Sequence, residues 1–108
     1  MTLAEIKTML ESIDGFAGKV AYDSFPLNEA PPLPFICFLE IQSDNFSADG
    51  IVYHAIKEVQ IELYSRYKDL ANETLVDNKL TQYGIFYQKE TIYLDDEKCY
   101  ETIYRMEI

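Results

Sequence analysis

The alternation of apolar and polar residues begins with a helix-like segment. Apolar residues recur at intervals of three and four over residues 3 to 13, which predicts an amphipathic helix with one buried stripe. Thr2 and Glu5 form a capping box at its start, because the hydroxyl can accept a helix N–H while the carboxylate reaches back to the cap. Gly15 is expected to end the helix. A helix this short must dock on a sheet to be stable.

A short strand and a proline-rich loop follow the helix. The strand is predicted around residues 20 to 22, and the loop covers residues 24 to 34, where prolines remove backbone donors and favour extended geometry without a ladder. The loop contains Phe25, Leu27 and Leu33. These residues predict that it lies on an apolar surface, which is either the core of the same chain or a neighbouring subunit.

Two longer strands are predicted in the middle of the chain. Residues 35 to 42 change from apolar on both faces to alternating, as expected for an interior strand whose far end reaches water. Residues 43 to 50 are polar and close on an Asp-Gly pair, which predicts a turn. Residues 51 to 65 then alternate in a long strand, with Glu58 and Glu62 on a half-polar face that meets solvent or a partner.

A second helix is predicted over residues 69 to 82. Asp69 is suited to the N-cap and Gly84 to the position after the helix. The residues that fall near helical spacing and are expected on one face are Leu70, Ala71, Thr74, Leu75, Asn78 and Leu80, with Leu75 on the core side.

The last quarter of the chain has the pattern of a β-hairpin. Residues 85 to 94 and 98 to 108 alternate, and the charged residues 95 to 97 separate them. The whole order is α-β-β-β-α-β-β over a single domain, residues 1 to 108. Runs of strands, in place of strict βαβ units, predict an α+β fold in which two helices pack on one face of a mostly antiparallel sheet.

Composition and charge narrow the classes of function. The chain is 48% hydrophobic with nine Tyr and six Phe, which is too apolar for a disordered chain despite a net charge of −10. That charge argues against specific nucleic-acid binding, which depends on Lys and Arg. The start of the chain lacks a signal-peptide pattern and no apolar run is long enough to span a bilayer, so we expect a cytosolic protein without a membrane partner. Cys37 and Cys99 are expected as buried free thiols.

The residues that could carry chemistry are few and scattered. His54 is the sole histidine, with no Ser or Cys close in sequence, and is interpreted as a surface or packing residue. Glu58 and Glu62 lie about 13 Å apart along an extended strand, which suits neither a shared-proton pair nor a compact metal site. The acidic residues 95 to 97 lack a calcium-loop pattern and are interpreted as a hairpin turn. We therefore expect no enzyme, no cofactor and no metal.

Several segments together resemble the tail-terminator and tail-completion proteins, or minor capsid proteins, of long-tailed bacteriophages and prophages. These segments are the helix leading into residues 19 to 23, the proline-rich approach 30 to 36, the strand and its exit 59 to 69, and the tyrosine-rich end 101 to 106. The likeness spans most of the chain and is one of order, length and texture, without a chemical signature.

The resemblance implies a non-enzymatic protein without a cofactor. It would form a ring, a hexamer, that caps the tail tube protein and docks to head connector proteins, first in the cytoplasm of the bacterial host and then in the virion. The candidate interface residues are Phe25, Leu27, Leu33 and Phe46, because aromatic and apolar residues in loops anchor interfaces. The alternatives are another head-tail connector or tail-completion adaptor, an acidic regulatory protein that mimics DNA, and a small enzyme with a scattered site.

Overall fold

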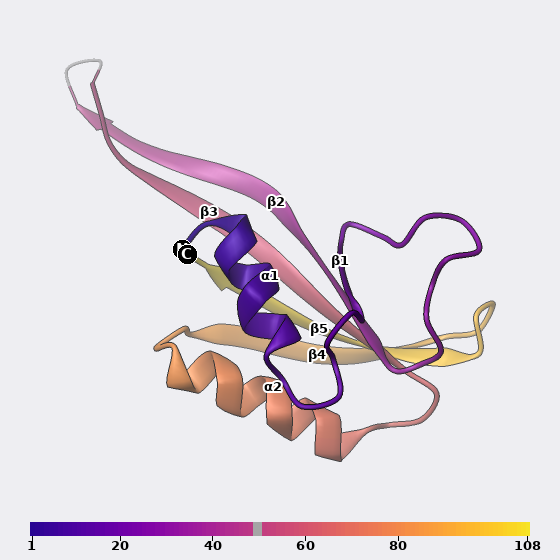
Figure 1. Cartoon of the computed structure of the whole chain (residues 1–108). Helices are drawn as coiled ribbons and strands as arrows, with labels where there is room; N and C mark the ends of the chain where they lie inside the picture. Colours follow the sequence, from indigo (N-terminus) through magenta and orange to yellow (C-terminus); the bar gives the residue numbers. More distant parts are fainter. Residues whose placement is uncertain (49–50) are drawn as a thin grey trace.

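The computed structural model describes residues 1–48 and 51–108, and within them the side chains of residues 43–48 and 51–55 are outside the description. The elements follow the predicted order α-β-β-β-α-β-β, and the chain folds as one α+β domain (Figure 1). The elements are α1 (Leu3–Glu11), β1 (Val20–Tyr22), β2 (Phe35–Ala48), β3 (Ile51–Ser65), α2 (Leu70–Gln82), β4 (Tyr87–Leu94) and β5 (Cys99–Glu107).

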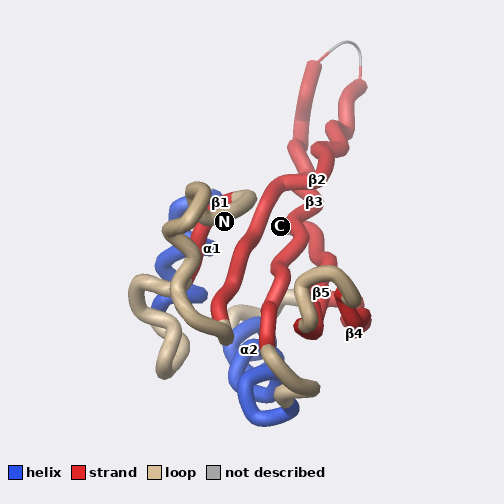
Figure 2. Tube along the Cα trace, turned by 90° about the vertical axis from the view of Figure 1, so that its right-hand side faces the viewer, coloured by secondary structure: helices blue, strands red, loops and turns tan. Residues whose placement is uncertain are grey.

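The five strands form one sheet in the order β1-β2-β3-β5-β4. β1 pairs with β2 in parallel, and the other three pairs are antiparallel, which confirms the mostly antiparallel sheet. Figure 2 shows α1 and α2 at different positions along the sheet, with α2 close to the end that carries β4 and β5. The proline-rich segment between β1 and β2 contains no strand, as predicted.

The core lies between the two helices and one face of the sheet. Side chains from α1, α2 and the central strands form a single buried cluster, and β3 contributes Val59, Ile61 and Leu63, which are fully buried. Burial of each such aliphatic side chain stabilises the fold by roughly 1.5 to 3 kcal/mol. The helices are short, so this shared cluster is what holds them on the sheet.

Both predicted helix starts are confirmed. Thr2 accepts a hydrogen bond from the Glu5 N–H at 3.1 Å and its own N–H donates to the Glu5 carboxylate at 2.9 Å, which completes the capping box. Asp69 caps α2 through the Asn72 N–H at 3.1 Å. The first helix stops at Glu11, earlier than predicted, because the Ser12 hydroxyl donates to a carbonyl of the last turn.

The predicted buried face of α2 is correct at Leu80 and wrong at Leu70 and Leu75. Leu70 and Leu75 are 65% and 38% exposed, whereas Glu73, Val76 and Leu80 are buried. The helix is rotated relative to the expectation because Glu73, a residue that a helical wheel places in solvent, is neutralised inside the protein by lysines from other segments.

The hairpin of β2 and β3 extends far beyond the rest of the sheet. Residues 43–48, predicted as a turn, continue β2 as a strand paired with β3, and the predicted Asp49-Gly50 turn lies outside the described residues. Register shifts after Glu40 and Phe46 mark β-bulges. The molecule measures 50 × 29 × 24 Å, and its radius of gyration of 15.0 Å exceeds the roughly 13 Å expected for a compact domain of this length.

Candidate functional site

The most distinctive feature of the molecule is this projection, which we call the arm and define as residues 41–48 of β2 and 51–56 of β3. On one side, β1 pairs with β2 only as far as Phe38. On the other side, β5 pairs with β3 from Glu58, and the Ile108 backbone exchanges hydrogen bonds with Lys57 at 2.9 and 3.2 Å. Within the described residues, the arm is therefore a two-stranded ribbon with no strand beside either outer edge (Figure 1).

A ribbon of this kind is poorly suited to stand alone in water. An isolated two-stranded hairpin is marginally stable, and each outer edge presents a row of backbone donors and acceptors that can pair with another chain. The arm is anchored well, because β3 continues without a break into the buried residues of the core.

The proline-rich loop packs on the face of the sheet away from the helices. The Phe25 ring meets the Phe35 ring edge-on at a centroid distance of 5.2 Å, and Phe35 in turn lies 5.2 Å from the Tyr64 ring. Phe25 and Leu33 are partly buried, so they pack against their own chain, whereas Leu27 is 89% exposed.

The four candidate interface residues therefore differ in how exposed their side chains are. Of the three in the proline-rich loop, only Leu27 offers a largely free apolar side chain. Phe46 belongs to the arm by its backbone, and its side chain lies outside the described residues. Their interface role stays a prediction.

Two carboxylates meet under this loop. The Tyr64 hydroxyl lies 3.0 Å from a Glu62 oxygen and 3.1 Å from a Glu101 oxygen, between neighbouring strands. Glu101 is 7% exposed. Burial, together with the hydrogen bond and negative charge of Glu101, raises the pKa of Glu62 to about 7. Glu62 is partly exposed, as the predicted half-polar face requires, but its acidic neighbour Glu101 comes from β5 and not from its own strand.

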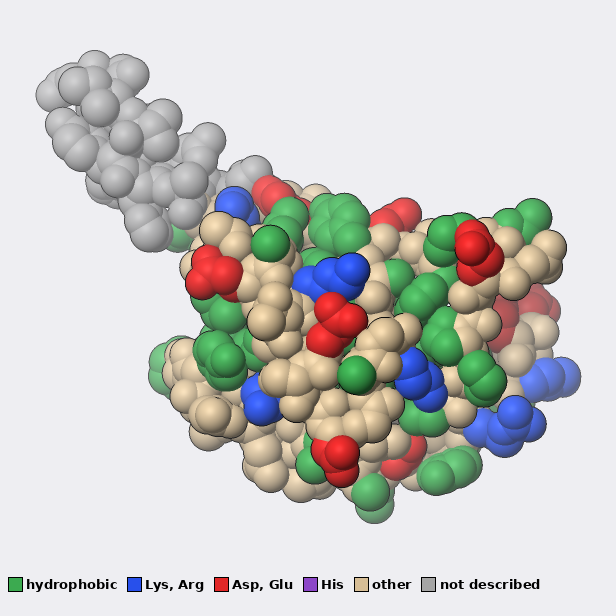
Figure 3. Space-filling view, viewed as in Figure 1, with side chains coloured by type: hydrophobic (Ala, Val, Ile, Leu, Met, Phe, Trp, Pro, Cys, Tyr) green, Lys and Arg blue, Asp and Glu red, His purple; other side chains and the backbone are tan. Residues whose placement is uncertain are grey.

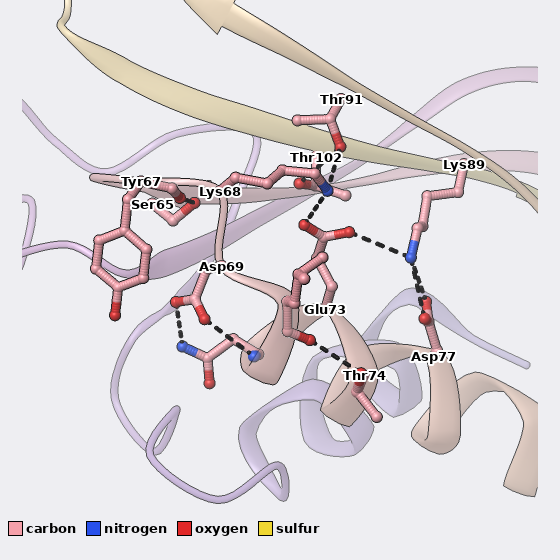
Figure 4. Close-up of polar contacts among 12 residues, drawn as sticks. Ser65, Tyr67, Lys68, Asp69, Glu73, Thr74, Asp77, Lys89, Thr91 and Thr102 are labelled. Atoms are coloured by element: carbon pink, nitrogen blue, oxygen red, sulfur yellow. Dashed lines mark hydrogen bonds and ion pairs between the residues drawn. The ribbon is translucent and has the colours of Figure 1, made fainter.

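A second polar cluster connects α2 to β4 (Figure 4). Glu73 is 2% exposed and its carboxylate contacts the ammonium groups of Lys68 and Lys89, the latter at 3.2 Å. Lys89 also contacts Asp77 at 3.0 Å. The Tyr104 hydroxyl donates to the Glu73 carbonyl at 3.3 Å. Both lysines form ion pairs with carboxylates. The cluster therefore links α2 to its neighbours and compensates the buried charge of Glu73.

A groove lies where β4 begins and β5 ends. It has a volume of about 640 Å³, and its lining includes Met1, Tyr83, Phe86 and Met106. Phe86 lies at the edge of the groove and is 93% exposed. Charged side chains are interspersed with hydrophobic ones over the body of the molecule on the face seen in Figure 3. The groove is shallow and mixed in character, without the convergent polar groups of a small-molecule site.

His54 lies on the arm, and its side chain is outside the described residues. Residues 95–98 form a turn between β4 and β5, as predicted. The described residues contain no group of three or more His, Cys, Asp or Glu side chains placed to hold a metal ion. In the same part of the chain, no helix is long and apolar enough to cross a membrane.

Comparison with models of known protein families and with curated protein sequences found no match. The interpretation of function therefore depends on the geometry of this chain. Sequence reasoning missed the arm because the polar composition of residues 43–48 is typical of a turn. The long alternating strand at residues 51–65 was the signal that could have revealed it, because a partner of equal length is needed to pair such a strand.

Proposed function

We propose that this protein is a structural subunit of the tail or head-tail joint of a long-tailed phage or prophage, and that it acts as a tail terminator. In this role copies assemble into a ring, a hexamer, that caps the tail tube and docks to the head connector. The observation that carries the proposal is the arm, because a projecting ribbon with two open edges is suited to contact between subunits.

The remaining support is chemical. The net charge of −10 disfavours adhesion of DNA phosphates, as needed by a ring through which DNA passes. The carboxylates of Glu62 and Glu73 are engaged in hydrogen bonds and ion pairs within the chain, so the described residues favour assembly as the function. The resemblance in element order and texture to terminator and tail-completion proteins points the same way.

The decisive experiment is deletion of the gene in the phage or prophage that encodes it, followed by electron microscopy of the particles. A terminator deletion should give overlong tails that are not joined to heads. Complementation with the parent gene should restore tails of normal length. Normal, head-attached tails after deletion would refute the assignment.

The same electron micrographs distinguish a tail terminator from the closest alternative, another head-tail connector. If the protein is another head-tail connector, deletion should leave tails of normal length that remain separate from intact heads. A ring seen by labelling at the head side of the joint, in place of the tail end, would also favour the connector.

A further inference from the structure

The outer edge of β4 is the best candidate for a site that receives another chain. All eight residues of β4 pair with β5 on one side, and within the described residues no strand lies on the other side. Proteins normally protect edge strands by making them short, by placing Pro in them or by a guarding Lys. The opposite edge strand, β1, has three residues and leads into the proline-rich loop, so it is protected in this way.

β4 lacks these protections. It contains no proline. Its single lysine, Lys89, is turned toward Glu73 and Asp77 on α2, at 3.2 and 3.0 Å, and therefore does not guard the edge. Apolar side chains flank the open backbone instead, because Phe86 and Ile92 are 93% and 41% exposed. An open edge with exposed apolar residues is a typical site for strand addition.

The chain itself contains the complementary element. The arm presents open edges over residues 41–48 and 51–56, close to the length of β4, which spans Tyr87–Leu94. The two surfaces are also matched in charge. Asp44 is the only Asp, Glu, Lys or Arg in the arm. In β4 the opposite charges of Lys89 and Glu90 cancel. The whole chain, by contrast, has a net charge of −10. Contact between these segments avoids the repulsion that most other surfaces of two copies would meet.

We propose that β4 of one copy receives the arm of a second copy as an added strand, with the exposed Phe86 and Ile92 side chains packing against it. The contact joins two different surfaces, an arm and a β4 edge, so when each copy binds a different neighbour at each surface, repetition of the contact produces a ring or an open chain. This inference rests on the proposed function as an assembly subunit, and it identifies the surfaces that meet.

The first test measures self-association of the full chain by sedimentation velocity over the accessible range of concentration. Ile92→Lys should weaken association about tenfold or more, because it places a charge in the new contact. Tyr67→Lys is the control matched in charge, since Tyr67 lies in the segment between β3 and α2 and is 64% exposed. Both variants lower the net negative charge, so general electrostatics would strengthen association in both.

Three results would overturn the proposal. They are a parent chain that stays monomeric throughout, an Ile92→Lys variant that associates like the parent, and equal weakening by Tyr67→Lys. Phe86→Ser supplies a second variant that does not depend on core packing, because the Phe86 ring is almost fully exposed. It should also weaken association while its thermal unfolding stays close to that of the parent.

A mixing experiment distinguishes this contact from a symmetric one. Asp44→Pro and Asn45→Pro each remove one backbone donor of β2, and because successive N–H groups on a strand point to opposite sides, one of the two variants blocks the outer edge of β2 in the arm. The edge-blocked arm variant, mixed with Ile92→Lys, should form a complex of two copies that grows no further. Failure to form any mixed complex would indicate that the arms or the β4 edges pair with their own kind, and would refute the proposal.

The outcome is independent of the gene-deletion experiment. Loss of association in Ile92→Lys with normal tails after deletion would retain the contact and reject the terminator role. Overlong tails after deletion, with unaltered association of Ile92→Lys, would retain the terminator role and reject the contact.

Discussion

The acidic pair under the proline-rich loop makes the stability of this protein depend on pH in an unusual direction. The pKa of Glu62 rises from its ordinary value of 4.5 to about 7 in the folded chain. The folded state therefore binds a proton that the unfolded state has released between these two values. The resulting contribution to stability is complete below about pH 4.5 and is lost as the pH rises through about 7.

The magnitude follows from the same shift. At 1.36 kcal/mol for each pKa unit, the rise of Glu62 corresponds to at most about 3 kcal/mol, and its partial exposure reduces this to about 1 to 2 kcal/mol. Glu62→Gln removes the titrating group and leaves an oxygen that can accept from Tyr64. We expect this variant to be more stable than the parent by that amount above pH 7, and nearly equal to it near pH 5.

The groups that face Glu62 must be considered together. Tyr64 lies beside it on β3, Glu101 faces it from β5, and Cys37 is its cross-strand partner on β2. Asp23 lies close enough to act on the Cys37 thiol. All four are acidic or neutral in this pH range, so none supplies a positive charge that would cancel the effect.

The assay is urea unfolding at a series of pH values, with the difference between variant and parent as the readout, because this subtracts the titration of the other residues. Glu58→Gln is the control, since Glu58 lies on the same face of β3 as Glu62. Its carboxylate accepts a hydrogen bond from the Gln42 side-chain amide at 2.5 Å, at an exposed position. A difference for Glu62→Gln that is constant from about pH 5 to about pH 9 would refute the raised pKa of Glu62 in the folded chain.

Three further predictions concern the core and the caps. Leu80→Ala should lower the free energy of unfolding by about 2 to 5 kcal/mol, whereas Leu75→Ala, on the exposed side of the same helix, should cost under about 1 kcal/mol, as checked by urea unfolding. Cys37 and Cys99 should react slowly with a thiol reagent until the protein unfolds, because both are buried and burial raises the pKa of the Cys37 thiol to about 11. Rapid reaction of both thiols in the native state would contradict this. Thr2→Ala should cost about 1 kcal/mol by removing the capping box, and an unchanged melting curve would count against the cap.

Features that depend on residues near in sequence could be predicted. The capping box at Thr2, the N-cap at Asp69 and the positive φ of 70° at Gly84 all act within one helical turn. Alternation at residues 51–65 likewise gave the bounds of β3. These signals are local, so the type and order of the elements follow from them directly.

Features that depend on distant partners could not be predicted in the same way. Glu73 is buried only because Lys68 and Lys89 converge on it, and this turns the inward face of α2 away from Leu75. Residues 43–48 have turn-like composition, yet they form a strand because cross-strand pairing with β3 determines their backbone.

The candidate interface was predictable only in part. Leu27 is exposed as a contact residue should be, but Phe25 packs against Phe35, a contact that requires knowing how the loop folds back. The edge at β4 could not be recognised from its sequence, because which strand lies last in a sheet is a property of topology. The sequence order of the strands differs from their order in space at β4 and β5.

The continuity of β3 has a mechanical consequence. The strand runs from the arm into the centre of the sheet, where β2 and β5 hold it on both sides and Val59 and Leu63 are fully buried. A pull along the arm would therefore load two ladders of hydrogen bonds lengthwise and together, and would not peel one strand away bond by bond. Tension applied to the arm would therefore be carried straight into the hydrophobic core.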